Sequence, residues 1–145
     1  MSLAAEVTVN IRFSDTDAMG VVWHGNYLRF LEDAREAFGN KYGLTYLDMY
    51  HNGYFTPIVK VDIDYKSPVY YGEKAKVVAT LKQAAAAKIV FEYKIINETT
   101  GAICAVGKTI QVFLNVKERN LELNKPSFYT EWEKKLGKEN VTETN

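Results

Sequence analysis

The stretch DTDAMGVVWHGNY, from Asp15 to Tyr27, decides how this chain folds. It holds two carboxylates, one of the two histidines of the chain, two glycines and an apolar run. From Trp23 onward the apolar residues recur at helical spacing, and the charged residues lie off that stripe. The stripe comprises Trp23, Tyr27, Leu31, Ala34 and Phe38, and the charged residues are Arg29, Glu32, Asp33 and Glu36. An acidic loop is therefore predicted to lead into the N-terminus of an amphipathic helix.

A helix N-terminus provides hydrogen-bond donors beside such a loop. Its first backbone N–H groups have no partner within the helix, and the helix dipole is positive at this end. Such a terminus binds a carboxylate or the oxygen of a polarised carbonyl. Asp17, His24 and these amides are thus candidates for a hydrolytic site.

Length and composition indicate one ordinary globular domain over residues 1–145. Hydrophobic residues make up 47% of the chain, which argues against disorder, and 18 basic residues balance 18 acidic ones. No net charge favours nucleic acid. The N-terminus lacks the pattern of a signal peptide, no apolar run is long enough for membrane insertion, and the single cysteine, Cys104, suits a reducing compartment. We expect a cytoplasmic protein.

The first half of the chain predicts one strand and two helices. Apolar and polar residues alternate from Val7 to Phe13, as in a strand with one buried face. After the amphipathic helix, Gly39 and Gly43 supply stop signals. A short second helix is expected from Leu44 to Tyr50.

The second half predicts strand after strand. Alternation over 59–65, 75–81 and 89–95 gives three strands, and a long run over 102–116 is expected to bulge or kink at Gly107. The inner residues expected of the first of these strands are Val59, Val61, Ile63 and Tyr65. A C-terminal helix is expected from about Ser127 to Leu136. The predicted class is α+β, with a curved antiparallel sheet wrapped around the early helix.

This order of elements resembles the hot-dog fold, in particular the 4-hydroxybenzoyl-CoA thioesterase and YbgC-like group of acyl-CoA thioesterases. The resemblance covers about Val7 to Val116. Its loop signature is Phe13, Asp15, Asp17, Gly20, Val21, Val22, Trp23, His24, Asn26 and Tyr27, with a weaker echo in Val61, Tyr65, Pro68, Val69 and Gly72.

The resemblance implies hydrolysis of an acyl thioester to a free acid and CoA. It assigns Asp17 as nucleophile or general base, leaves the choice between these open, and places the oxyanion donor among the amides around His24 and Gly25. The His24 side chain would position water or assist the leaving thiolate. The implied contacts to substrate are Gly20, Met19, Trp23, Asn26 and Phe55, with Lys66 and Lys88 as candidates for the CoA phosphates.

The resemblance also implies a homo-oligomer, a dimer or a dimer of dimers, with each site built from two subunits. No metal is expected, and coenzyme A enters only as part of the substrate. One departure from the group is Phe13, where YbgC-like members often carry tyrosine, so any role of that hydroxyl is absent here.

Other interpretations of these residues stay open. An aspartate in Asp17's place commonly caps a turn, Asp15 is expected to structure the loop, and His24 can simply pack. The thioester carrier is either CoA or acyl carrier protein, and the acyl group is not determined by the sequence. A hydratase of the same fold and a non-catalytic acyl-thioester-binding module are the alternative functions.

Overall fold

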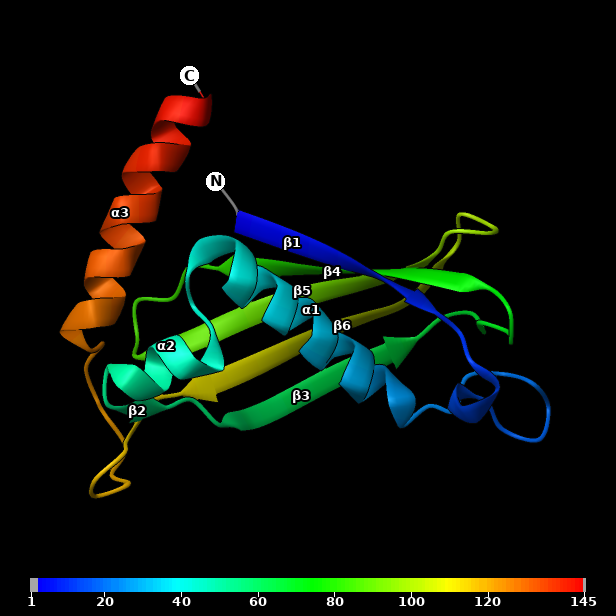
Figure 1. The fold of residues 1–145 in the computed structure, drawn as a ribbon, viewed down its shortest axis with the longest axis horizontal. Helices are drawn as coiled ribbons and strands as arrows, with labels where there is room; N and C mark the ends of the chain where they lie inside the picture. The colour runs from blue at the N-terminus through cyan, green and yellow to red at the C-terminus, as the bar shows by residue number, and fades with distance from the viewer. Residues whose placement is uncertain (1–2, 145) are drawn as a thin grey trace.

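A long helix packed in the curve of an antiparallel sheet forms the centre of the protein (Figure 1). The computed structural model describes residues 3–144, and the side chains of residues 3–137. The sheet has the strand order β1-β4-β5-β6-β3. Its strands are β1 (Leu3–Asn10), β4 (Lys74–Lys82), β5 (Lys88–Asn97), β6 (Ile103–Val112) and β3 (Ile58–Tyr65). The remaining elements are η1 (Phe13–Asp15), α1 (Asn26–Tyr42), α2 (Tyr46–His51), β2 (Tyr54–Phe55), β7 (Leu114–Asn115) and α3 (Ser127–Thr144).

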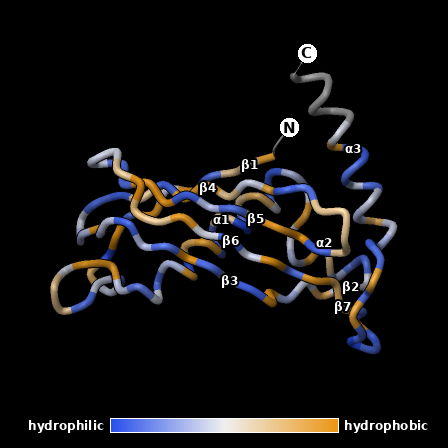
Figure 2. The backbone as a smooth tube through the Cα atoms, turned by 180° about the vertical axis from the view of Figure 1, so that it is seen from behind, coloured by the Kyte–Doolittle hydropathy of each residue, from blue (hydrophilic) through white to orange (hydrophobic). Residues whose placement is uncertain are grey.

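Helix α1 supplies one side of the core. Its predicted stripe is confirmed from Tyr27 to Phe38, whereas Trp23 precedes the helix and is half exposed. The helix ends at Gly43, whose φ of 74° is the left-handed conformation that favours glycine and whose N–H donates to the Gly39 carbonyl. Alternate residues of β4 and β5 are buried in the core as well, as their patterns predicted. Figure 2 shows the same sheet from behind, with hydrophilic and hydrophobic positions along the strands.

The first strand ends earlier than predicted. Strand β1 stops at Asn10, and the chain turns through η1, so Phe13 points to solvent and is 76% exposed instead of lying on a buried face. The turn lets the Asp15 carboxylate accept a hydrogen bond from the Arg12 backbone N–H. An extended chain does not allow this hydrogen bond. The polar contact therefore prevails over the alternating pattern.

The expected break at Gly107 is also wrong. Strand β6 runs without interruption through Gly107 and ends at Val112, and the chain re-pairs only at β7, after Phe113. Gly107 serves close packing instead. A Cβ there would lie 3.2 Å from the Asp62 carbonyl oxygen and 3.5 Å from Leu31 of α1.

Strand β3 forms an open edge of the sheet. Its residues Val59 and Val61 were expected on the buried face, yet they are 60% and 39% exposed, because α1 packs against β1 and β4 and does not cover this edge. At the opposite edge, Val7 and Val9 of β1 pack against the core. The two edges of the sheet thus differ in how much apolar surface they leave uncovered.

The C-terminal helix is longer than predicted and closes one end of the core. Tyr129 is buried, and the Trp132 indole N–H donates to the Tyr42 carbonyl at 2.8 Å, which ties α3 to the end of α1. None of the helices in the described part of the chain is both long and apolar enough to cross a membrane.

Replacing Gly107 by valine should lower the free energy of unfolding by about 1–3 kcal/mol, the usual cost of overpacking, because the added atoms meet Asp62 and Leu31. Urea denaturation followed by circular dichroism measures this. The matched control is Gly137→Ala in α3, where a Cβ meets no described atom within 4 Å and helix propensity favours alanine. Equal stability of the Gly107→Val variant and the wild type would contradict the packing role.

Candidate active site

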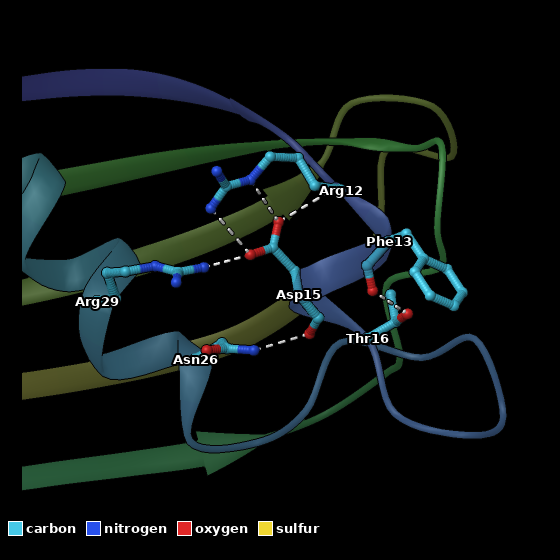
Figure 3. A network of polar contacts seen from close by, with 6 residues as sticks. All are labelled: Arg12, Phe13, Asp15, Thr16, Asn26 and Arg29. Carbon is cyan, nitrogen blue, oxygen red and sulfur yellow. Dashed lines mark hydrogen bonds and ion pairs between the residues drawn. The ribbon is translucent and has the colours of Figure 1, made fainter.

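Asp15 holds the loop together between η1 and α1. Its side chain is fully buried, and its Oδ2 accepts a hydrogen bond from the Arg12 backbone N–H at 2.8 Å. The Arg12 and Arg29 guanidinium groups both reach its Oδ1 (Figure 3). Two cations and a backbone donor thus surround one buried carboxylate, and the expectation that Asp15 structures the loop is confirmed.

Burial by itself would raise the pKa of the Asp15 carboxyl. The bonds from the Arg12 backbone and side chain and from Arg29 outweigh that effect and hold the pKa below its usual value. The carboxyl group is therefore ionised at neutral pH, and its negative charge is paired with Arg12 and Arg29.

The Asp15 main chain places the beginning of α1. Its carbonyl oxygen accepts hydrogen bonds from the Trp23 N–H at 3.0 Å and from the Asn26 side-chain amide at 2.8 Å (Figure 3). Asn26, predicted to contact substrate, thus uses its amide N–H to anchor the helix start to the loop. The thirteen-residue stretch closes on itself through these bonds.

Asp17 combines a turn contact with an available carboxylate oxygen. Its Oδ1 accepts from the Met19 N–H at 2.8 Å and from the Val21 N–H at 3.4 Å, and its own N–H donates to the Val21 carbonyl at 2.8 Å. Gly20 completes the turn with φ of 74°. Oδ2 has no hydrogen-bond donor among the side chains and backbone that the structure describes. The turn-capping interpretation is therefore correct for one oxygen and leaves the other free to react.

The N-terminus of α1 has no side-chain cap. Gly25 occupies the N-cap position, and the first turn contains no acidic residue. Within residues 3–144, neither the His24 N–H nor the Gly25 N–H has a hydrogen-bond acceptor. The Trp23 ring lies so close to Gly25 that a Cβ there would overlap it. Two backbone donors are therefore left available beside an aromatic ring.

The His24 imidazole lies among aromatic rings. Its ring centroid is 4.9 Å from that of Trp23 and 6.4 Å from that of Tyr65, and the side chain is exposed. The Tyr65 hydroxyl donates to the His24 carbonyl at 2.9 Å. Sequence reasoning missed this contact, since Tyr65 was named only as an alternating residue of its strand and in the weaker part of the family resemblance, without a role in the site.

The remaining predicted contacts divide between the two ends of the sheet. Met19 at the loop tip and Lys66, directly after β3, lie at the end that carries Asp17. Phe55 pairs with Leu114 and Lys88 begins β5, both at the opposite end. A single chain therefore does not bring Phe55 or Lys88 to Asp17.

Fold and loop together define a thioesterase-like protein of the hot-dog type. The sequence profile of the Thioesterase-like superfamily matches residues 11–136, and the chain belongs to this family. The predicted fold and family are thereby confirmed.

Several relatives and solved structures are similar to this chain. YneP of Bacillus subtilis, named as a candidate acyl-CoA thioesterase, is 38% identical over 61% of this chain, and the match spans 64% of YneP's own length. A 1,4-dihydroxy-2-naphthoyl-CoA hydrolase of Crocosphaera subtropica is 32% identical over 75% of this chain and 81% of that protein. The structure of a DHNA-CoA thioesterase from Staphylococcus aureus superposes with a TM-score of 0.82 at 28% identity, covering 96% of this chain and 94% of that one.

Replacing Asp15 by asparagine should destabilise the protein by about 1.5–3 kcal/mol at pH 7, since hydrogen bonds to a charged group are lost. A depressed folded pKa stabilises the fold above the unfolded value of about 3.9 and ceases to do so as pH falls through the folded pKa. The difference between wild type and variant should therefore shrink towards pH 3 in thermal melts. The exposed Asp33→Asn on α1 is the matched control. A difference that is the same at pH 7 and pH 3 would count against the ionised network.

Proposed function

We propose that this protein is an acyl-CoA thioesterase that hydrolyses an acyl thioester to a free acid and CoA. The observation that carries the proposal is the pairing of a free Asp17 oxygen with two unpartnered amides at an uncapped helix N-terminus, within one loop. The family, and relatives named for hydrolysis of acyl-CoA, support it.

In the proposed mechanism the amides of His24 and Gly25 receive the thioester carbonyl oxygen. Neither N–H has an acceptor among the described residues, so both are available as negative charge develops on that oxygen. Asp17 Oδ2 either attacks the carbonyl carbon or removes a proton from the attacking water. The turn bonds to Oδ1 hold the carboxylate in place in both cases. Breakdown of the tetrahedral species expels the CoA thiolate, and we assign to His24 the task of assisting its departure. Where Asp17 is the nucleophile, the mixed anhydride left on Asp17 is then hydrolysed by water, which releases the free acid and restores the carboxylate.

Asp17→Asn should reduce thiol release by at least about 100-fold, the usual contribution of a general base, while the fold is kept. The measurement is thiol release from a panel of acyl-CoAs of graded chain length together with hydroxylated aromatic acyl-CoAs. The matched control is Asp33→Asn, an exposed residue of α1 away from the loop and from β3, which should release thiol at the wild-type rate. Full activity of the Asp17→Asn variant would overturn the assignment.

The same panel, extended by an enoyl-CoA and by acyl carrier protein thioesters, separates the alternatives. Tight binding of acyl-CoA by the wild type without thiol release would favour a binding module over an enzyme. Loss of absorbance from an enoyl-CoA without thiol release would indicate a hydratase. Release from acyl carrier protein thioesters alone would assign the carrier, since both carriers present the same phosphopantetheine arm.

We further propose that two copies pair through β3. This edge leaves Val59 and Val61 exposed, an apolar strip that pairing with a second copy would bury. Isologous antiparallel pairing inverts one sheet relative to the other. Within one chain the β2–α2 end and the Asp17 loop lie at opposite ends of the sheet (Figure 1), so this inversion would bring the β2–α2 end of one chain towards the Asp17 loop of the other.

Such pairing supplies what one chain lacks. The β2–α2 end carries Phe55 and a groove of about 510 Å³ between α1, α2 and the sheet. The apolar floor of the groove is formed by Phe38, Leu44, Met49, Ile89 and Phe91. An acyl group held at the partner's Asp17 loop would face this apolar surface, and Phe55 would join the site from the second chain.

Val61→Lys should shift the protein from dimer to monomer and reduce thiol release, because a buried lysine in the β3 interface carries an uncompensated charge. Sedimentation velocity measures the association state. Thr8→Lys places the same charge on β1, the other edge strand, and should leave the dimer intact. A dimer that persists unchanged in Val61→Lys would refute pairing through β3.

A further inference from the structure

Tyr65 makes a contact that neither the core nor the sheet requires. Its hydroxyl donates to the His24 carbonyl oxygen at 2.9 Å, across 41 positions of sequence. The Tyr65 ring meets the Tyr27 ring edge to face, with centroids 5.1 Å apart, although the residue as a whole is 51% exposed. The ring thus packs on the first turn of α1, and its hydroxyl reaches His24, the residue before the Gly25 N-cap.

The bonded carbonyl shares a peptide group with a candidate oxyanion donor. The His24 C=O and the Gly25 N–H belong to one planar unit, so holding the oxygen also fixes the direction of the N–H. The other donor to this carbonyl, the Tyr27 N–H, is distant at 3.4 Å. The hydrogen bond from the Tyr65 hydroxyl is therefore the shorter of the two that reach the His24 carbonyl oxygen. A hydrogen bond to a carbonyl also polarises the amide and strengthens its N–H as a donor.

Trp23 closes the other side of the same peptide. Its ring occupies the space where a Cβ of residue 25 would lie, so the glycine is held between an aromatic ring and an anchored carbonyl. The peptide is thereby clamped from β3 and from the loop together, and its N–H remains without an acceptor among residues 3–144.

We propose that Tyr65 is a positioning residue that holds the His24–Gly25 peptide in the orientation in which its N–H receives the thioester oxygen. This inference rests on the proposed function, because it assigns a task to the same oxyanion amides. Tyr65 itself acts through the peptide and not on the reacting atoms.

The test is Tyr65→Phe, which removes the hydroxyl and keeps the ring against Tyr27. We expect kcat for thiol release to fall about 3- to 10-fold, the equivalent of one ordinary hydrogen bond, with KM changed less than about 2-fold. The melting temperature should stay that of the wild type. Tyr71→Phe removes a hydroxyl from an exposed tyrosine and should leave kcat unchanged. An unchanged kcat in Tyr65→Phe, or a loss that follows a lower melting temperature, would overturn the proposal.

A second readout needs no turnover. The infrared C=O stretch of an acyl-CoA bound to Asp17→Asn reports how strongly the amides polarise the thioester. We expect it to lie below the free value, and to move back towards that value in the Asp17→Asn/Tyr65→Phe double variant. A lowered stretch that is the same in both proteins overturns the role of Tyr65 alone. A stretch at the free value in Asp17→Asn itself overturns the oxyanion amides, and the proposed mechanism with them.

Discussion

One buried carboxylate anchors the end of the molecule where the candidate site lies. Asp15 draws its charge partners from both sides of the loop, Arg12 from just after the end of β1 and Arg29 from the first turn of α1. Its carbonyl oxygen binds Trp23 and Asn26, which fixes where the helix begins. A buried charge is tolerated only when it is paired and hydrogen-bonded, so these contacts form together or not at all. Strand, loop and helix are locked in one arrangement by that requirement.

Two aspartates of one short motif have opposite tasks because their surroundings differ. Asp15 is buried, and its charge is neutralised by two arginines. Asp17 lies at the turn two residues later, where backbone donors reach only one of its oxygens. A carboxylate that is fully paired has little basicity to offer, whereas a half-satisfied one keeps a lone pair for chemistry. Burial and pairing give Asp15 its structural role, and the Asp17 oxygen without a donor among the described residues is the reason that Asp17 is the one proposed to react.

Much of the fold followed from apolar periodicity. The face of α1 from Tyr27 to Phe38 and the inner residues of β4 and β5 were predicted correctly, because burial against a single partner leaves a clean pattern. The pattern misled where another force prevailed. Phe13 fitted the alternation, but the Asp15 network turned it outward. Gly107 looked like a bulge, yet it marks a close approach between β6, β3 and α1.

The candidate site was predictable in its residue types and not in its contacts. Asp17, His24 and Gly25 were identified from the motif, since the functional chemistry is concentrated in one local stretch. Tyr65 was not, because its hydroxyl meets His24 through tertiary structure, and a tyrosine in a strand is most simply explained by packing. Phe55 and Lys88 lie at the end of the sheet opposite Asp17. The sequence predicted them in the same site as Asp17, but a single chain does not bring them together.

The features proposed for function are those that reduce the stability of a single chain. With glycine at the N-cap position the helix forgoes about a few tenths of a kcal/mol relative to serine or aspartate, and the Trp23 ring leaves no room for such a side chain. An edge strand with exposed valines invites association. A side-chain cap would satisfy the amides to which the proposed mechanism assigns the substrate carbonyl. Under the two proposals, substrate and a second copy supply at these positions the contacts that a single chain lacks.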